Sequence, residues 1–542
     1  MSWWKEAVFY HIYPKSFYDS NGDGIGDIGG IIQKLDYLNG TPDSLGIDAI
    51  WLSPVYPSPM VDGGYDVANY IDIDPMFGTL DTFSLLIKEA HKRDIKIIMD
   101  LVINHTSDKH PWFIESSSSR DNPKSDWYIW KNPEDQKPPN KWLSAFGGSA
   151  WKFNEDRNQY YLHSFAKEMP DLNWRNPEVK EEIFKSIRFW LDLGVDGFRL
   201  DVVNYYVKDI EFRNNPSYFY KSLRAYDCQV HIYDRNRPET HEILKDFRKL
   251  LDSYTDRVSI GEVFQPPPGS SKLPAAFYGE KSDELHLNFN FAFTYCKWNP
   301  IQFMEAIVAW EKSLKSSDWP TYFLSNHDFK RHISRHGNGN NAIPRAKIAA
   351  IMLLTLKGTP FLYYGEELGM LSERIPYKKI QDPAGKKYWP IFPGRDISRL
   401  PMCWENGLNA GFSTVEPWLP INQEYHKTNV KTEAKSRKSL LTFYKKLIAI
   451  RKKYDSLRIG SFEPIDLDSE RIMAYLRKID KKEQMLILLN FSDKKDKFIL
   501  ENRPIPLRNA QVIFSTHKRE DSGINIAIIH LEPYEGTIVK LE

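Results

Sequence analysis

The sequence has few cysteines, no long apolar run and no excess of either charge. Only three cysteines occur in 542 residues. Cys228, Cys296 and Cys403 are far apart and odd in number, which argues against a disulfide framework or a cysteine metal site. The sequence contains no run of about 18 apolar residues, and its N-terminus lacks a basic segment followed by an apolar one. We therefore expect a soluble, cytoplasmic protein without a membrane span.

The charge balance and the aromatic content narrow the class of partner. The chain has 73 basic and 72 acidic residues, so we expect neither nucleic acid nor an anionic membrane as a partner. Aromatic residues make up 14% of the chain; they can stack on sugar rings, although large aromatic cores also use them. A neutral small molecule is the expected ligand, and nothing in the sequence indicates the oligomeric state.

Short β-rich runs alternate with helical patterns along most of the chain. The runs are residues 7–17, 48–55, 96–104, 197–203, 257–264, 283–290, 321–328 and 360–367. Between them, apolar residues recur at helical spacing in 80–94, 177–194, 237–254 and 300–316. This alternation predicts an α/β fold with a parallel sheet, closed into a (β/α)₈ TIM barrel. An open doubly wound sheet is the alternative, but no Gly-rich dinucleotide motif follows the first run.

Two irregular segments and a late change of pattern predict the domain organisation. Residues 105–173, rich in Trp, Pro, Ser and Asn, predict a subdomain inserted after the third strand, and a second irregular segment, 371–426, follows the eighth strand. From residue 457, short strands follow one another without helices, which predicts a C-terminal antiparallel β-sandwich domain at 457–542. These strands are expected at 471–479, 484–492, 510–516 and 526–542. The barrel then comprises 1–104 and 174–456.

Polar and charged side chains lie where the predicted strands end. They are Asn104 and His105, Arg199 and Asp201, Glu262, and His327 and Asp328. In a (β/α)₈ barrel the chemistry takes place at the C-terminal ends of the strands. A single buried acid at such a position could equally be structural. Three carboxylates at the ends of three strands, with an arginine beside one of them, indicate a functional site.

This set of side chains, without a phosphate loop or redox motif, fits glycoside cleavage and requires no organic cofactor. A retaining hydrolase needs a carboxylate nucleophile and a carboxylic acid about 5 to 5.5 Å apart. A third carboxylate can stabilise the positive charge of the transition state. We expect Arg199 to lower the pKa of Asp201 and keep it ionised. We expect burial to raise the pKa of Glu262, so that it is protonated and can act as the acid.

Four motifs in this order, "DLVINH", "GFRLD", "GEV" and "SNHD", resemble the signature regions of the α-amylase family of glycoside hydrolases. "DGGYDVANY", "MPDLNW" and "RLPMCWENGLNAGFS" look most like the α-glucosidase and oligo-1,6-glucosidase group of that family. The resemblance implies that Asp201 is the nucleophile, Glu262 the general acid/base and Asp328 the transition-state stabiliser. It also implies a pocket for one terminal glucose, lined by Asp62, Tyr65, His105, Arg199, His327 and Arg399.

Two motifs depart from the pattern of this group. Met169 stands where the group usually has the glutamine of Gln-Pro-Asp-Leu-Asn, and Leu400 stands where it usually has threonine after the pocket arginine.

The sequence features that indicate the preferred linkage conflict. In relatives, a valine directly after the nucleophile, here Val202, accompanies α-1,6 cleavage, whereas residues 202–216 resemble enzymes that act on short α-1,4-linked sugars.

We therefore expect a retaining, exo-acting α-glucosidase that releases glucose from the non-reducing end of short α-glucosides. α-1,6 linkages (isomaltose-type) are slightly favoured over α-1,4 linkages (maltose-type). The main alternative is a glucosyl-transferring or sucrose-isomerising enzyme of the same family. A non-catalytic sugar-binding relative is less favoured, because such proteins lack one or more of the three carboxylates.

The segment "DSNGDGIGD" at residues 19–27 begins like a calcium-binding EF-hand loop. The twelfth position, however, is Gly30 and not a bidentate glutamate, and a predicted strand precedes the loop where an EF-hand has a helix. The segment can still supply a set of oxygen ligands for a metal ion, although it is not an EF-hand. It resembles the metal loop of the oligo-1,6-glucosidase group, and a structural Ca²⁺ is its expected ion. Mg²⁺ and a solvated turn without metal are the alternatives. The set consists of Asp19, Asn21, Asp23, the carbonyl of Ile25, and Asp27.

Overall fold

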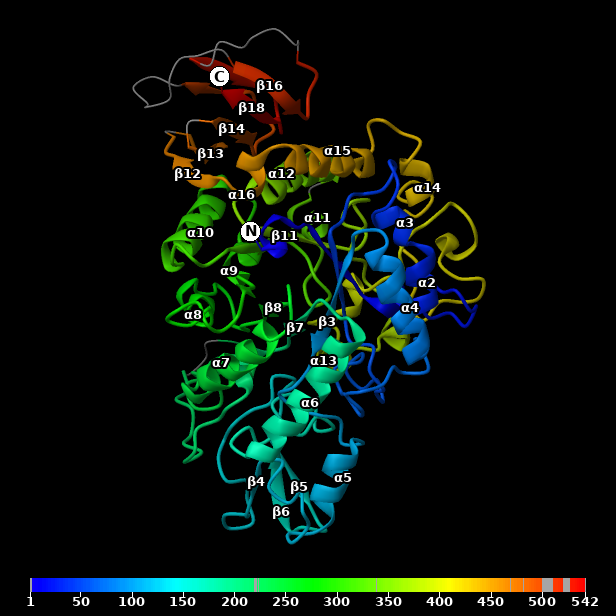
Figure 1. The fold of residues 1–542 in the computed structure, drawn as a ribbon, viewed down its shortest axis with the longest axis vertical. Coiled ribbons are helices and arrows are strands. Elements are labelled where there is room, and N and C mark those ends of the chain that lie inside the picture. Colours follow the sequence, from blue (N-terminus) through cyan, green and yellow to red (C-terminus); the bar gives the residue numbers. More distant parts are fainter. Residues whose placement is uncertain are drawn as a thin grey trace.

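Eight parallel strands form a nearly closed barrel at the centre of the molecule, in the order β10-β11-β1-β2-β3-β7-β8-β9 (Figure 1). The computed structural model describes residues 2–218, 222, 224–337, 339–467, 469–480, 482–499, 510–519 and 527–541. The barrel strands are β1 (Phe9–Ile12), β2 (Ala49–Leu52), β3 (Lys96–Leu101), β7 (Gly197–Leu200), β8 (Val258–Gly261), β9 (Leu287–Asn288), β10 (Thr321–Phe323) and β11 (Thr359–Tyr363). β10 and β9 are the first and last strands of this order. The hydroxyl of Thr321 on β10 links them by donating to the carbonyl of Asn288 on β9 at 2.5 Å. The predicted TIM barrel is confirmed.

Side chains on the barrel strands alternate between the interior and the surrounding helices, as the two-residue period of a strand requires. On β1, Phe9 belongs to the inner aromatic cluster, whereas Tyr10 and Ile12 pack in the outer core with the helices. Within the barrel, His11 stacks on Trp51 with ring centroids 3.6 Å apart. These rings fill the barrel, so a substrate can bind only above them, at the strand ends.

Helices cover the outside of the barrel. α4 (Leu80–His91), α6 (Pro177–Leu193), α7 (Glu239–Asp252) and α10 (Pro300–Ser313) lie where the sequence predicts helices. In α6, the Asn176 side chain accepts the N–H of Glu178, proline occupies the first turn, and Gly194 ends the helix with φ 109°. Among the described residues, no helix is both long and apolar enough to span a bilayer.

Residues 105–173 contain a small three-stranded antiparallel sheet in the order β4-β6-β5. This subdomain lies at the lower end of the molecule in Figure 1. Its elements are α5 (Pro111–Ser118), β4 (Trp130–Lys131), β5 (Trp151–Asn154) and β6 (Gln159–Leu162). A bridge between His105 and Asp171 brings the two ends of the segment together beside the end of β3.

The C-terminal part of the chain forms two antiparallel sheets. One has the order β12-β13-β14-β18-β16 and the other pairs β15 with β17. Phe498 of the small sheet packs with Leu486 and Val539 of the large one, which confirms the predicted β-domain. Within the predicted strand 526–542, residues 526 and 542 lie outside the described part. The strands are β12 (Ser461–Ile465), β13 (Ile472–Ile479), β14 (Glu483–Asn490), β15 (Asp496–Ile499), β16 (Ala510–Ser515), β17 (Ile528–Leu531) and β18 (Gly536–Leu541).

Two buried arginines join the C-terminal domain to the barrel through backbone carbonyls. Arg477 of β13 donates to the carbonyls of Thr355 and Leu457, at 3.0 Å for the latter. Arg451 of α15 (Leu440–Lys453) donates to the carbonyls of Leu354, at 2.8 Å, and Leu457, at 3.0 Å. These donors satisfy carbonyls at the C-terminal end of α12 (Ala342–Thr355), which a helix leaves without partners of its own.

Three acidic side chains lie close together on the outer side of β11. Glu367 accepts hydrogen bonds from the hydroxyls of Tyr10 (2.8 Å) and Tyr37 (2.6 Å), and burial raises its pKa to about 7. Glu366 accepts from Tyr444 at 3.4 Å. Glu433, at the end of α14 (Val430–Glu433), accepts the backbone N–H of Leu441 at 3.0 Å; burial, reinforced by the charge of Glu367, raises its pKa to about 8.

Candidate active site

One buried guanidinium holds three carboxylates together at the centre of the barrel mouth. Nη1 of Arg199 lies 2.8 Å from Asp201 and 2.8 Å from Asp100, and Nη2 lies 2.5 Å from Glu262. The side chains of Arg199, Asp100 and Glu262 are 1%, 0% and 5% exposed, and that of Asp201 is 9% exposed. Arg199 therefore fixes the two carboxylates that follow β7 and β8 relative to each other.

The register of the sheet places this arginine. Arg199 pairs with Asp100 on β3 and with Ile260 on β8, so its side chain points in the same direction as theirs. Its neighbour Phe198 points outward into the helical core. The strand period therefore directs a charged side chain into the barrel, where it is stable because three acids surround it.

The chain turns sharply directly after Asp201. Val202 has φ 37° and ψ 49°, in the left-handed region, which β-branched residues rarely adopt. The turn directs the N–H of Val202 toward Oε2 of Glu262, 3.3 Å away, while the N–H of Val203 donates to the carbonyl of Glu262 at 2.9 Å. The segment that carries Asp201 thus also orients Glu262.

Burial dominates the electrostatics of these acids. It raises the pKa of Glu262, as expected from the sequence, although Arg199 opposes the shift. Burial also raises the pKa of Asp201 well above its ordinary value; Arg199 opposes this shift, and the charge of Glu262 adds to it. The charge of Arg199 lowers the pKa of Asp201, as expected from the sequence, but burial outweighs this effect and the net shift is upward. The cluster holds a proton at a higher pH than free carboxyl groups would.

A tyrosine and two histidines line one side of the site. The hydroxyl of Tyr65 donates to Asp100 at 2.9 Å and lies 2.8 Å from Nε2 of His327, so this nitrogen carries the hydrogen. Nε2 of His105 lies 3.1 Å from the carbonyl of Tyr65. Burial lowers the pKa of His327, as do the charges of nearby arginines, and burial lowers the pKa of His105 to about 4. Both rings are neutral and can exchange hydrogen bonds with sugar hydroxyls.

Asp328 lies beside His327, between two arginines. Nη2 of Arg399 and Nη1 of Arg395 each lie 3.3 Å from its Oδ1, and Nε2 of His327 lies 3.2 Å from its Oδ2. Its side chain is 26% exposed, the most open of the carboxylates at this site. Arg395 also contacts Asp62. Asp62, Asp328 and their arginines therefore form a second charged group beside the Arg199 cluster.

A buried ammonium group fastens the inserted subdomain to the barrel beneath the site. Nζ of Lys208 lies 2.7 Å from Oδ2 of Asp171 and donates to Oδ1 of Asn104 at 2.9 Å. Both charged side chains are fully buried. Asp171 also accepts the backbone N–H of Ser164 at 2.8 Å. Lys208 thus links the end of β3, the loop after β7 and the segment 105–173.

Three phenylalanines form an aromatic wall beside Glu262 and Asp328. Phe264 follows Glu262 by two residues and Phe329 follows Asp328 directly. Phe291 lies between them, with its ring centroid 6.4 Å from that of Phe264 and 5.6 Å from that of Phe329. An apolar face of this kind can stack on a sugar and exclude water.

Comparison with known proteins agrees with this geometry. The family described as "Alpha amylase, catalytic domain" matches residues 11–460. The chain belongs to the alpha-amylase family. An oligo-1,6-glucosidase of Parageobacillus thermoglucosidasius is 40% identical and covers 99% of both chains. A probable alpha-glucosidase of Rhizobium meliloti (strain 1021) is 43% identical over 91% of this chain and 90% of its own length. The crystal structure of an alpha-glucosyl transfer enzyme is 36% identical, covers 100% of both chains and superposes with a TM-score of 0.91.

The barrel of this alpha-amylase family member brings the predicted site residues into one connected network. Through hydrogen bonds or ion pairs, each joins either the Arg199 cluster or the Asp328 cluster, and the Tyr65–His327 contact links the two clusters. The residues concerned are Asp62, Tyr65, His105, Arg199, Asp201, Glu262, His327, Asp328 and Arg399. Val202 lies between the nucleophile and acid/base candidates.

Three further residues of the site are absent from the sequence prediction. Asp100 could have been found, because it is a carboxylate inside an otherwise apolar strand. Lys208 and Arg395 lie in irregular segments, where a charged residue carries no such signal. Their importance depends on contacts between segments that are far apart in the sequence.

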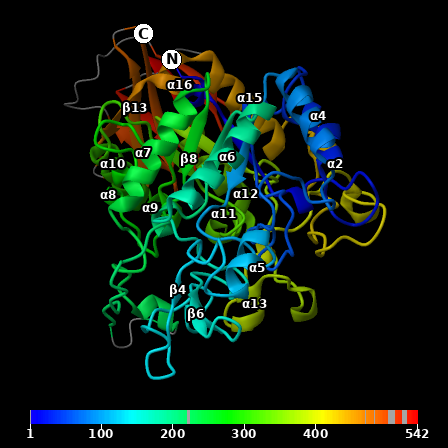
Figure 2. The ribbon, with the colours of Figure 1, turned by 60° about the horizontal axis from the view of Figure 1, so that its bottom comes forward.

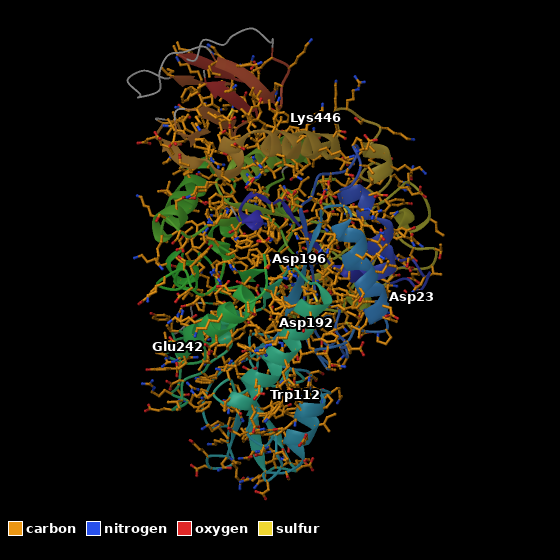
Figure 3. The ribbon with its side chains drawn as sticks, in the orientation of Figure 1. Asp23, Trp112, Asp192, Asp196, Glu242 and Lys446 are labelled. Carbon is orange, nitrogen blue, oxygen red and sulfur yellow. The ribbon has the colours of Figure 1, made fainter. Side chains whose placement is uncertain are left out.

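The loop at residues 19–27 lies away from the catalytic pocket, at the edge of the molecule near α2 (Ile28–Gln33) and α4, where Figure 3 labels Asp23. Asp19 accepts backbone N–H groups on both carboxylate oxygens, and Asp27 caps α2 by accepting the N–H of Gly30. Burial raises the pKa of Asp19, but hydrogen bonds from Ser413 and from the loop backbone outweigh this effect and leave the pKa below its ordinary value. An ionised, oxygen-rich loop of this kind fits a hard cation. In the described part of the chain, no group of three or more His, Cys, Asp or Glu side chains is already arranged as a metal cage.

Proposed function

We propose that this protein is a retaining, exo-acting α-glucosidase. It cleaves the bond that follows the terminal, non-reducing glucose of short α-linked oligosaccharides or disaccharides. The named activities of the oligo-1,6-glucosidase and alpha-glucosidase relatives support this proposal, and the match to the former covers 99% of both chains.

The observation that carries the proposal is the single guanidinium shared by Asp201 and Glu262. Its two terminal nitrogens contact one oxygen of each acid, at 2.8 and 2.5 Å. One shared guanidinium keeps the two acids close together, and retaining enzymes have their two carboxyl groups about 5 to 5.5 Å apart.

The proposed roles follow from the contacts. Asp201, ionised and held by Arg199, attacks the anomeric carbon, and the leaving oxygen takes a proton from Glu262. Oε2 of Glu262 accepts the N–H of Val202 and contacts Arg199, so Oε1 carries the transferable proton. The resulting glucosyl ester is hydrolysed by a water molecule that Glu262, now ionised, deprotonates. Asp328, held by Arg399, stabilises the positive charge that develops on the sugar ring in both steps.

We propose a slight preference for α-1,6 over α-1,4 linkages. Val202 is 6% exposed and its backbone adopts the turn directly above the nucleophile, so its branched side chain narrows the space on the leaving-group side. An α-1,6 bond adds an exocyclic carbon, which moves the second sugar away from this side chain.

Transfer of the glucosyl group to a sugar is a second candidate function. The wall formed by Phe264, Phe291 and Phe329 beside Glu262 favours it, because apolar rings bind a sugar acceptor better than they bind water. The structural relative named as an alpha-glucosyl transfer enzyme supports it as well.

We also propose a structural Ca²⁺, or alternatively Mg²⁺, in the loop at residues 19–27, and a cytoplasmic location. The acid-rich composition of the loop and the lowered pKa of Asp19 support a bound cation. The cation would be held by the side chains of Asp19, Asn21, Asp23 and Asp27 and the carbonyl of Ile25. Cys228, Cys296 and Cys403 are all unpaired thiols, which supports a reducing compartment.

One experiment tests the activity, the linkage and the acceptor together. Maltose, isomaltose, sucrose and p-nitrophenyl α-glucoside are incubated separately with the enzyme, and the products and their anomers are followed by NMR. The proposal requires release of α-glucose, with isomaltose cleaved at least as fast as maltose. Initial release of β-glucose would exclude a retaining mechanism, and formation of new disaccharides from sucrose would favour the second candidate.

A further inference from the structure

The wall of phenylalanines continues into the connection between β7 and α7. Tyr205, at the end of the 3₁₀ turn η2 (Val203–Tyr205), has its ring centroid 6.5 Å from that of Phe264. Its centroid also lies 5.4 Å from that of Phe165, whose ring in turn lies 5.4 Å from that of His105. These contacts form one continuous row of rings around the site. We call it the aromatic row, and it consists of Phe165, Tyr205, Phe264, Phe291 and Phe329.

Two rings of the row are tied to the segments that carry the proposed acid and the proposed nucleophile. Phe264 follows Glu262 by two residues, and Tyr205 follows Asp201 by four. The side chain of Asn204 donates to the carbonyl of Phe264 at 2.9 Å and accepts its N–H at 3.1 Å, so the two segments are joined. Since Glu262 protonates the oxygen between the two sugars, the leaving sugar lies on its side of the pocket. The aromatic row therefore borders the space for that sugar.

One buried guanidinium holds the only hydroxyl group of the aromatic row. Nη1 of Arg235 donates to the hydroxyl of Tyr205 at 2.5 Å and to that of Tyr226 at 3.3 Å, and the two hydroxyls lie 2.5 Å apart. The guanidinium carbon lies 5.2 Å from the ring centroid of Tyr205 and 6.0 Å from that of Phe264. Arg235 is 4% exposed. It therefore supports two neighbouring rings of the row from one position.

The surroundings of Arg235 keep it charged and in place. Burial disfavours its charged form, but the two tyrosines and Asp234 outweigh burial and leave its pKa above the ordinary value. Burial raises the pKa of Tyr205 and of Tyr226, so both hydroxyls keep their protons. The N–H of Asn236 donates to the carbonyl of the residue before Tyr205 at 2.7 Å. The backbone beside Arg235 is thus fixed to the backbone beside the ring that it holds.

The connection that carries Arg235 also packs against the inserted subdomain. Nε1 of Trp142 donates to the carbonyl of Arg213 at 2.8 Å, and the side chain of Gln229 donates to the carbonyl of Lys141 at 2.7 Å. Figure 2 shows this connection, in green below α7, beside β4 of the subdomain. The connection therefore supports the aromatic row from a base that spans two parts of the molecule.

We propose that Arg235 is a positioning residue that holds Tyr205 and Phe264 as a rigid wall against the leaving sugar. It thereby determines how well the enzyme uses disaccharides relative to substrates with a very small leaving group. The proposal rests on the proposed α-glucosidase function and extends it to the side of the pocket that receives the second sugar. An acceptor sugar would meet the same wall, because it attacks from the place that the leaving sugar vacates.

The test compares R235M, R235K and Y226F with the wild type on maltose, isomaltose and α-glucosyl fluoride. The leaving group of the fluoride is a single atom, so this substrate does not reach the wall. R237M is the matched control. Arg237 supports the same connection by donating to the carbonyl of Ile232 at 3.1 Å and by lying 3.4 Å from Asp209. Circular dichroism and thermal melting show whether each variant is folded.

In R235M we expect kcat/KM to fall about tenfold or more for both disaccharides and to stay within about threefold of the wild type for α-glucosyl fluoride. R235K retains a charged donor without the planar fork, so part of the disaccharide activity should return. Y226F removes one partner of the Tyr205 hydroxyl and should cause a smaller loss in the same direction. R237M should change kcat/KM by the same factor for all three substrates.

A double-mutant cycle shows whether Arg235 acts through Tyr205. In a Y205F background the guanidinium has no hydroxyl to hold, so the loss caused by R235M should be smaller than in the wild type. Full additivity of the two substitutions would overturn the proposal. So would a folded R235M that loses the same factor for the fluoride and for the disaccharides, or that loses activity on neither. If R235M does not fold, an equal change for all substrates in Y226F overturns it. A wild-type enzyme that cleaves no α-glucoside would instead refute the proposed function.

Discussion

Glu433 offers a direct test of the buried acid cluster outside the active site. Its pKa is raised from 4.5 to about 8, chiefly by burial, so the folded protein holds this proton more tightly than the unfolded chain does. The contribution of this proton to the stability of the folded protein is fully present below the pKa that Glu433 has in the unfolded chain. It is lost as the pH rises toward the pKa of Glu433 in the folded protein. At pH 7 this loss of stability amounts to about 3 kcal/mol, and at pH 5 to about 1 kcal/mol.

Replacement of Glu433 by Gln removes the titration but keeps a carbonyl that can accept the N–H of Leu441, now 3.0 Å from the carboxylate. The free energy of unfolding of E433Q, relative to that of the wild type, should therefore rise by about 2 kcal/mol between pH 5 and pH 7. At about 2.1 cal/mol/K per residue, the unfolding entropy of a chain of 542 residues converts this gain into a melting-temperature difference of about 2 °C.

Scanning calorimetry of wild type and variant at both pH values measures this difference. Glu242 on α7, labelled in Figure 3, provides the control, because its side chain is 74% exposed. E242Q should shift the melting temperature equally at pH 5 and pH 7. A melting-temperature difference for E433Q that is the same at both pH values, or that becomes less favourable at pH 7, would refute the reasoning.

Four further predictions concern the site and its supports. D201N should lower kcat by several orders of magnitude without changing the circular dichroism spectrum, and wild-type turnover would exclude Asp201 as nucleophile. The wild-type profile of kcat/KM against pH should be bell-shaped, because protonation of Asp201 reduces the rate at low pH and ionisation of Glu262 reduces it at high pH; burial moves both limbs above the ordinary carboxyl range. Dialysis against EDTA should lower the melting temperature of the wild type and have little effect on D23N, whereas equal responses would argue against a metal in this loop. K208M should lower the free energy of unfolding by about 3 to 5 kcal/mol, because it leaves Asp171 buried without its cation. In a thermal melt, the double variant K208M/D171N should recover part of this loss. If the effects of the two substitutions on stability are fully additive, the pair is not coupled.

The barrel and its catalytic acids could be predicted because their signals are local. A charged residue directly after an apolar strand, such as Asp201 or Glu262, is recognisable without knowledge of distant segments. α6 was predictable for the same reason, since its cap, its period and its terminal glycine are adjacent in the sequence. By contrast, α12 is buried on nearly all sides between the barrel and the C-terminal domain, so it shows no amphipathic period.

Other features depend on hydrogen bonds that the hydrophobic pattern of a strand does not reveal. The sequence predicts a strand at 283–290, but β9 comprises only Leu287–Asn288. The N–H groups of Glu284 and Leu285 donate to the carbonyls of Tyr278 and Phe277, so this part of the run forms a turn and does not extend the strand. The shared contacts of Arg395 arise in a comparable way, because they join segments whose approach is determined only by the completed fold.

The carbonyl contacts of Arg451 and Arg477 have a consequence for how the chain can be divided. All the proposed catalytic residues precede residue 457, so a designer of a shorter enzyme would first consider removing the C-terminal domain. A chain ending there, however, would lose Arg477 and expose the apolar face of α12, leaving the carbonyl of Thr355 without its donor. The portion that carries out the reaction is thus smaller than the portion that can fold, and an autonomous catalytic fragment would need a new polar surface on α12 and a new partner for its last turn.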